Sequence, residues 1–125
     1  DTEHRRRSIY IFARRNLRFP MFDVFDRPDS NLSCSRRDES TTALQSLTLL
    51  NSSFSSRVSQ DLAKRVATEY NQTDERIHRL YTLLFSRPPS DQERDMGLKF
   101  LRTANNELSH YCLALLNTNE AIYID

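Results

Sequence analysis

The chain contains one glycine, Gly97, among its 125 residues. Glycine supplies the left-handed backbone of tight hairpin turns, so this scarcity argues against an all-β fold. Long apolar runs are also missing, and none approaches the ~20 residues of a membrane-spanning helix. Gly-rich phosphate loops, nucleophile elbows, CxxC pairs and CxxCH haem-attachment motifs do not occur. We therefore expect no membrane insertion, no cofactor held by this chain and no small-molecule substrate.

Lysine is scarce as well, because 16 of the 18 basic residues are arginine. The net charge is only +1, which provides no overall attraction for nucleic acid. The charge is uneven, however: residues 1–37 hold nine arginines and five acidic residues, whereas residues 38–125 are net negative. Arginine is suited to bidentate ion pairs and to stacking on aromatic rings, so this composition indicates more than a solubilising surface. We expect a soluble domain that does not bind nucleic acid.

Two cysteines, Cys34 and Cys112, are too few for a disulfide framework. Cys112 falls on an apolar helical pattern, where a small buried thiol is the ordinary interpretation. A Cys34–Cys112 disulfide is the alternative, and it would suit an oxidising compartment. Both interpretations stay open at the level of the sequence.

The centre of the chain has the spacing of amphipathic helices. Apolar residues recur every three or four positions and predict one buried stripe, formed by Leu44, Leu47, Leu50, Phe54, Val58, Leu62 and Val66. Four serines at positions 52, 53, 55 and 56 are poor helix formers, so we expect a break near residues 52–55. This region therefore predicts two helices.

Three more helices are predicted towards the C-terminus. Thr73 is expected to cap the third, and Arg87 lies in its last turn, before Pro88-Pro89. Ser90 and Glu93 have the spacing of a capping box and begin the fourth, with Met96 and Phe100 facing inward. Leu108, Tyr111, Cys112, Leu115 and Leu116 indicate the fifth. Arg87, Ser90 and Glu93 are accordingly predicted to be structural residues.

The two ends of the chain have the composition of strands. The segments Ser8–Ala13 and Ala121–Asp125 are β-branched and aromatic, and the economical interpretation pairs them. We therefore expect a mainly α fold, with about five helices in an irregular bundle and short terminal strands. An α+β fold, with more strands supplied by sequence outside this chain, is the alternative. The whole chain, 1–125, is interpreted as one domain.

The segment from Arg14 to Arg37 alternates charge with large apolar residues. Pro20 is expected to open one short helical turn there and Pro28 to close it. Its aspartates are interpreted as structural partners of Arg14, Arg15, Arg36 or Arg37. If Asp26 is buried in such a pair, its replacement by alanine should be strongly destabilising. The alternative is a site for an anionic ligand, whose candidate residues are Arg14, Arg15, Asp26, Arg36 and Arg37.

Two Glu-x-x-His pairs, Glu75/His78 and Glu107/His110, have the spacing of di-iron ligands in helical bundles. At about 100° per residue, however, these side chains lie away from the apolar stripes of their helices. We expect surface residues and no metal site. No residue of the chain is assigned as catalytic.

Four sequence blocks, in order, carry a family resemblance over nearly the whole chain, from about Arg6 to Asp125. They are RRSIYIFARRNLRFPMFDVFDRPDSNLSCSRR, STTALQSLTLLN, RIHRLYTLLFSRPPSDQE and LALLNTNEAIYID. The chain resembles the C-terminal part of a planctomycete-specific domain of unknown function that accompanies cytochrome-c-like modules. One departure, Ala43-Leu44-Gln45-Ser46-Leu47, replaces a Pro-Gln-Ala-Leu-like helix start.

This resemblance implies an extracytoplasmic location, periplasmic or secreted, and a larger exported multidomain parent with haem in another domain. The chain begins at Asp1 and contains no signal peptide, which fits the C-terminal part of a longer protein. We expect a non-catalytic interaction or assembly module with a protein or polysaccharide partner. The alternatives are part of a polysaccharide-active enzyme and a module that binds an anionic ligand such as a sulfated glycan.

Overall fold

The computed structural model describes residues 8–10, 19–28, 33–34, 36, 40–103 and 107–123. The chain divides into two compact units, residues 1–45 and residues 46–125, and each is described by itself. Within the described residues the secondary structure consists of seven α-helices and one 3₁₀ helix, with no strand. The prediction of a mainly α fold is confirmed for this part of the chain.

The first unit contains a 3₁₀ helix (η2, Ser8–Tyr10), the short helix α1 (Pro20–Val24) and the start of α2 (Ala43–Asn51). Pro20 occupies the first turn of α1, as predicted, where its missing N–H costs nothing. Within this unit the rings of Phe19 and Phe22 lie 5.3 Å apart, and the guanidinium of Arg27 lies 5.4 Å from the Phe22 ring centre. Local aromatic contacts therefore support a helix of only five residues.

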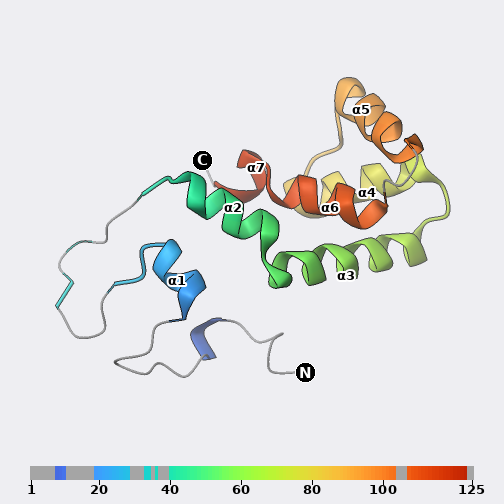
Figure 1. Cartoon of the computed structure of the whole chain (residues 1–125). Helices are drawn as coiled ribbons and strands as arrows, with labels where there is room; N and C mark the ends of the chain where they lie inside the picture. The colour runs from blue at the N-terminus through green and yellow to red at the C-terminus, as the bar shows by residue number, and fades with distance from the viewer. Residues whose placement is uncertain are drawn as a thin grey trace. The chain divides into compact units, whose positions relative to one another are not determined.

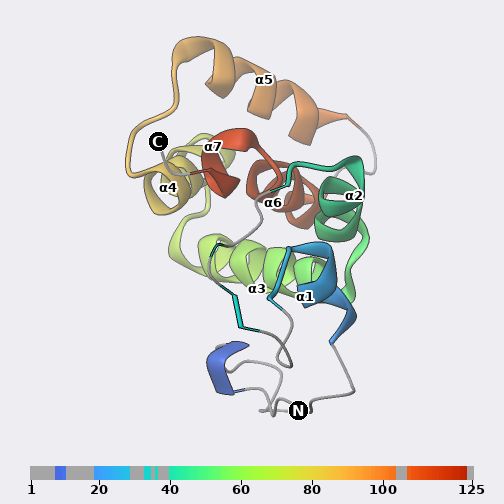
Figure 2. The same cartoon turned by 90° about the vertical axis from the view of Figure 1, so that its left-hand side faces the viewer.

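The second unit is a layered set of helices (Figures 1 and 2). It contains α3 (Ser53–Glu69), α4 (Thr73–Phe85), α5 (Asp91–Arg102), α6 (Leu108–Leu116) and α7 (Asn119–Ile122). Both views place α4 and α6 between α3 on one side and α5 on the other. The most extensive packing joins α3 to α6, and α5 packs mainly on α4.

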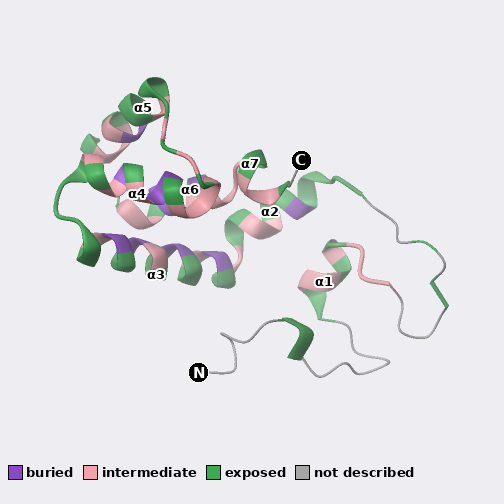
Figure 3. Ribbon diagram, turned by 180° about the vertical axis from the view of Figure 1, so that it is seen from behind, coloured by how far each residue is buried: buried purple, intermediate pink, exposed green. Residues whose placement is uncertain are grey.

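The core of this unit forms where α3, α4 and α6 meet. Ile77, Leu80, Val66 and Cys112 have essentially no exposed surface, and Tyr81, Tyr111, Leu115 and Ala63 complete the buried cluster. Figure 3 shows the buried residues of α3 along the side of the helix that faces α4 and α6. The predicted core residues of the third and fifth helices are therefore largely confirmed.

The predicted break in the long helical pattern is present at Ser52. Its hydroxyl accepts a hydrogen bond of 3.0 Å from the backbone N–H of Ser55 and caps the start of α3, while α2 ends at Asn51. Serine competes with the backbone for hydrogen bonds, which makes it a poor interior residue and a good cap. The serine cluster thus separates two helices.

Several sequence predictions are wrong in detail. Ser8–Tyr10 is a 3₁₀ helix and Asn119–Ile122 is helical, so the described parts of both predicted strands are not strands; residues 11–13 and 124–125 lie outside the described residues. Short apolar runs do not distinguish a strand from a helix, and local context decides. The cap of α4 is Gln72, one residue before Thr73, and Met96 is 66% exposed because Gly97 takes the inward position.

Candidate functional site

In the first unit, the carboxylate of Asp26 ties the end of α1 to the start of α2. One oxygen accepts hydrogen bonds from the backbone N–H of Ser40 at 2.8 Å and from its hydroxyl at 2.6 Å. Asp26 has a left-handed backbone, with φ of 54°, which a short polar side chain tolerates better than most residues. The two bonds from Ser40 lower the pKa of Asp26. The carboxylate therefore fixes the two ends of the segment 26–40.

Gln45 extends this network and caps α2. Its amide oxygen accepts from the N–H of Thr42 at 3.1 Å, while the N–H of Gln45 lies 3.4 Å from the Thr42 hydroxyl. This reciprocal pair is a Thr-x-x-Gln capping box. The amide nitrogen of Gln45 also donates to the carbonyl of Val24 at 3.0 Å and to the Ser40 hydroxyl at 3.3 Å. Gln45 is buried, so its four hydrogen bonds satisfy the polar atoms that burial removes from water.

The predicted anion-binding residues are only partly described. Arg14, Arg15 and Arg37 lie outside the described residues, while Arg36 is exposed. Asp26 is only half-buried, and the donors described for it are the backbone N–H and the hydroxyl of Ser40. Its pairing with Arg14, Arg15 or Arg37 stays a prediction, because these arginines lie outside the described residues. Charge alternation in the sequence does not point to a hydroxyl partner. Ser40 lies at the hydroxyl-rich entry of α2, where such a partner could have been sought.

The second unit contains a denser cluster around Arg87, at the end of α4. Its guanidinium donates to both carboxylate oxygens of Glu93 at 2.8 and 2.9 Å and to both oxygens of Glu120 at 2.7 and 2.8 Å. The carbonyl of Pro88 accepts the remaining bond at 3.2 Å. These five bonds match the five N–H groups of a guanidinium. The Arg87 cluster, defined as Arg87, Glu93 and Glu120, thus joins α4 to α5 and α7.

Ring contacts and a capping box complete the cluster. The guanidinium of Arg87 lies 5.5 Å from the ring centre of Tyr81 and 5.7 Å from that of Phe85, within the range of cation–π attraction. Glu93 accepts from the N–H of Ser90 at 2.7 Å, and the Ser90 hydroxyl accepts from the N–H of Glu93. The capping box that the sequence predicts is therefore present at the start of α5.

These contacts change the acidity of the two carboxylates. Hydrogen bonds from Arg87, and then from the N–H of Ser90, lower the pKa of Glu93 to about 2. The pKa of Glu120 is lowered by Arg87 as well, and both carboxylates raise the pKa of Arg87. Because every N–H of Arg87 already has a protein acceptor, the geometry favours a structural clamp over an anion site. The sequence pointed to Arg87 and Glu93, but Glu120 is 33 residues away and carries no local signal.

An open groove of about 390 Å³ lies along α4. Its lining consists of Tyr70, Asp74, Glu75, His78, Arg79 and Thr82. Two of its charged residues already have partners, since Arg79 donates to Glu69 at 2.8 Å and Arg94 to Asp74. Glu75 and His78 are exposed, as are Glu107 and His110. Within the described ranges, no three His, Cys, Asp or Glu residues come together in a way that could hold a metal ion.

Both cysteines are free thiols in the structure. Cys112 has no exposed surface in the core of the second unit, where burial raises its pKa to about 12, whereas Cys34 is exposed and donates to the carbonyl of Arg36. Cys112 is therefore placed as the small buried thiol of the first interpretation, and a Cys34–Cys112 disulfide between the two units stays a prediction.

Exposed apolar side chains follow one another along α2 and the first turns of α3. We name four of them, all in the second unit, the apolar stripe: Leu47, Leu50, Phe54 and Val58, which are 37–53% exposed; Leu44, in the first unit, is 59% exposed. The sequence predicts these residues to be buried, together with Leu62 and Val66. Only Val66 is buried and Leu62 partly so. For the first five residues that prediction is wrong.

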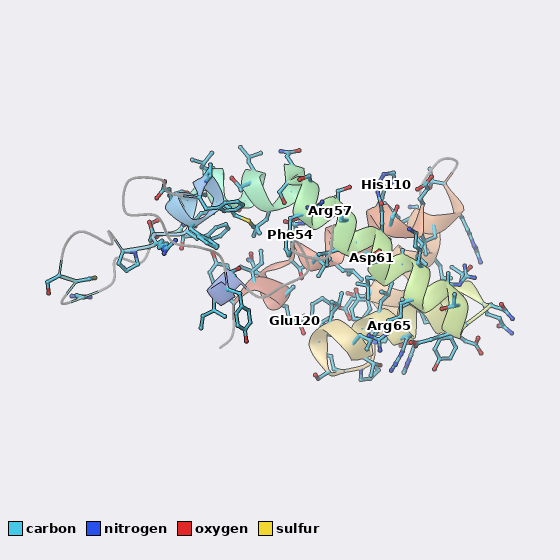
Figure 4. The ribbon with its side chains drawn as sticks, turned by 90° about the horizontal axis from the view of Figure 1, so that it is seen from below. Phe54, Arg57, Asp61, Arg65, His110 and Glu120 are labelled. Carbon is cyan, nitrogen blue, oxygen red and sulfur yellow. The ribbon has the colours of Figure 1, made fainter. Side chains whose placement is uncertain are left out.

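The apolar residues of α3 are exposed because a neighbouring face of the helix packs on the core. This helix buries Ser55, Ser59, Ala63 and Val66, a row of small residues at intervals of three and four. Ser59 satisfies its hydroxyl by donating to the carbonyl of Ser56 at 2.8 Å, so burying it leaves no orphan polar group. Small side chains let two helices approach closely, and α3 packs on α6 through this row. Figure 4 shows Phe54, Arg57, Asp61 and Arg65 spaced along α3.

Comparison with known proteins identifies the family. A family with the description "Protein of unknown function (DUF1553)", PSD1, matches residues 1–101. The chain belongs to this family. No curated protein and no solved structure matches the chain. The family match includes the Asp26–Ser40–Gln45 network and the Arg87–Glu93 pair, and it stops before Glu120. Among the described helices of this DUF1553 member, none has the length and hydropathy to cross a bilayer.

Proposed function

We propose that this DUF1553 chain is a non-catalytic interaction module that assembles with a protein partner. The resemblance noted in the sequence extends the proposal to an extracytoplasmic, cytochrome-c-associated parent, with haem in another domain. The observation that carries the proposal is the apolar stripe, because four large apolar side chains exposed along α2 and the first turns of α3 form the kind of patch that often binds a partner.

The size of the stripe supports this proposal. With exposed fractions of 37–53%, its four side chains present roughly 300 Å² of apolar surface, at the lower end of the range for the largest patch on a typical monomer. Covering that surface would contribute roughly 8 kcal/mol before the costs of association, at about 25 cal/mol per Å². Patches of this size are often interaction sites.

Affinity capture tests the proposal with a matched pair of variants. The full chain, immobilised, is exposed to a periplasmic extract of its native host, alongside the double variant Leu47→Glu/Phe54→Glu and the control Gln60→Glu. Gln60 is exposed on α3, roughly 120° around the helix from Phe54. We expect one specific partner that the wild type and the control retain and the double variant loses. Retention of the same proteins by all three would contradict the proposal.

Two other functions stay predictions. Binding of a sulfated glycan rests on Arg14, Arg15, Asp26, Arg36 and Arg37, and of these only Asp26 and Arg36 are described, with Asp26 already bonded to Ser40. Polysaccharide hydrolysis would need a further carboxylate beside Asp26. Thermal stabilisation by sulfate beyond a chloride control tests the first, and turnover of a glycan panel by the full-length parent tests the second.

A further inference from the structure

The two carboxylates of the Arg87 cluster are held unequally. Glu93 accepts from two nitrogens of Arg87 and from the backbone N–H of Ser90, and it belongs to the capping box that begins α5. Among the described residues, Arg87 is the one donor to Glu120, at 2.7 Å from Nε and 2.8 Å from Nη2. The side chain of Glu120 is 47% exposed, compared with 27% for Glu93. Glu93 is therefore fixed by its own helix, whereas Glu120 depends on a single residue.

The helix that carries Glu120 is weakly anchored. Helix α7 has four residues, none of them buried, and Thr118 at its N-cap makes no capping hydrogen bond with its side chain. A helix this short is not stable by itself, and elements with few buried contacts are the first to open in a folded protein. The core lies elsewhere, on α3, α4 and α6. Release of α7 from Arg87 would therefore leave the core of the second unit in place.

Departure of Glu120 would leave two parallel donors on Arg87. These donors are the N–H of Nε and one N–H of Nη2, the fork that binds a planar carboxylate with two hydrogen bonds. The rings of Tyr81 and Phe85, 5.5 and 5.7 Å from the guanidinium, and the bonds to Glu93 would keep this fork in position. Arg87 and Glu93 together carry no net charge, so a carboxylate restores the present charge, whereas a dianion such as phosphate would add repulsion beside Glu93.

We propose that Arg87 is a carboxylate-binding site, which Glu120 of the same chain keeps closed and which a carboxylate of a protein partner occupies by displacing it. Exposed ion pairs contribute little to stability, so the contact with Glu120 is a modest barrier to exchange. The tether gives Glu120 an effective concentration in the millimolar range or above, so it excludes isolated carboxylates and yields to a partner that makes further contacts. This inference goes beyond the proposed function, because it does not involve the apolar stripe.

Chemical rescue of the full-length variant Glu120→Ala tests the site. This substitution removes the internal carboxylate and leaves room for acetate beside Arg87. Thermal unfolding at about pH 7 is compared in about 0.3 M sodium acetate and in the same concentration of sodium chloride. Acetate should raise the Tm of Glu120→Ala by about 2–4 °C more than that of the wild type. Glu75→Ala, which removes an exposed carboxylate elsewhere on α4, is the matched control and should respond as the wild type does.

Nuclear magnetic resonance gives a direct readout of Arg87. The Nε–H signal of Arg87, assigned by its loss in Arg87→Lys, should shift with acetate in Glu120→Ala and stay in place in the wild type. Two further probes distinguish the source of the carboxylate. The α-amide of N-acetylglutamate carries a side-chain carboxylate, and N-acetylalanine carries that of a chain end. The probe that binds Glu120→Ala more tightly identifies the source, and both should bind the wild type at least about fivefold more weakly.

An Arg87 signal that no carboxylate moves in Glu120→Ala overturns the proposal and leaves the cluster as a structural clamp. Equal responses of the wild type and Glu120→Ala would show that Glu120 does not close the site. A Tm shift of the same size in Glu75→Ala would be a general effect of acetate and would also count against the site. If Glu120→Ala fails to fold, Glu120→Gln, whose neutral side chain competes poorly, replaces it in the same measurements. The affinity capture with stripe variants is independent of these results, so the proposed function stands or fails separately.

Discussion

Replacing Gly97 by alanine is expected to destabilise the second unit, although alanine is the better helix former. Gly97 is the one glycine of the chain, and it is buried in the middle of α5. A Cβ atom there would lie 2.5 Å from the hydroxyl oxygen of Tyr111 and 3.0 Å from Cδ1 of Ile77. Contacts below 3.0 Å are not tolerated, so α5 or Tyr111 must move.

The magnitude follows from two opposing effects. Glycine in a helix interior costs about 1 kcal/mol relative to alanine, so the substitution gains that much from propensity. Overpacking a well-filled core costs about 1–3 kcal/mol, and the 2.5 Å overlap with a rigid, buried tyrosine belongs in the upper part of that range. The net loss is about 1–2 kcal/mol, or roughly 4–16 °C in Tm for a unit of this size.

Thermal and urea unfolding of a double-mutant cycle would measure the effect. Tyr111→Phe removes the oxygen that the new methyl group would meet, together with the hydrogen bond between the hydroxyls of Tyr111 and Tyr81. Gly97→Ala/Tyr111→Phe should therefore lose less stability than the sum of the single variants. A Gly97→Ala protein as stable as the wild type would refute the close approach of α5 to Tyr111.

Two further predictions concern the carboxylates. Because the folded-state pKa of Glu93 is lowered to about 2, its contribution to stability is fully present above about pH 4.5 and is lost as the pH falls towards 2. Thermal unfolding between pH 7 and pH 2 should accordingly show a smaller pH dependence for Glu93→Gln than for the wild type, and equal slopes would contradict this. The pKa of Asp26 is also lowered, so the ionised carboxylate stabilises the folded state above about pH 4. The Asp26→Asn variant should therefore be less stable than the wild type above that pH. The stabilities of the two proteins should become equal as acid protonates Asp26. Faster amide exchange at Ser40, whose N–H donates to Asp26, is the readout, and unchanged exchange would count against that bond.

Local chemistry predicted the parts of the fold that depend on neighbouring residues. The serine cluster predicted the break at Ser52, and the spacing of Ser90 and Glu93 predicted the capping box of α5. The clean stripe around Ile77 and Leu80 correctly identified the core of α4. In each case a side chain interacts with backbone or side chains within one or two turns, and the sequence shows that interval directly.

The remaining features depend on contacts that the sequence does not show. The spacing of its apolar residues predicted that α3 buries the apolar stripe. The helix instead buries Ser55, Ser59 and Ala63, because their small side chains let α3 pack closely on α6. Glu120 joins the Arg87 cluster across 33 residues, and Ser40 reaches Asp26 across 14. Charge alternation near Asp26 suggested arginine partners and gave no sign of the Ser40 hydroxyl, which donates to the carboxylate.

The row of small residues on α3 has a consequence for how the sequence can vary. At Ser55, Ser59 and Ala63 the limit on substitution is volume, because a longer side chain would separate α3 from α6 whatever its polarity. Exchange between serine and alanine should cost little there, glycine should cost about 1 kcal/mol through helix propensity alone, and leucine, the favoured residue of an ordinary core, should be among the most damaging. Substitution tables that score residues by hydrophobicity would therefore rank variants at these three positions in the wrong order.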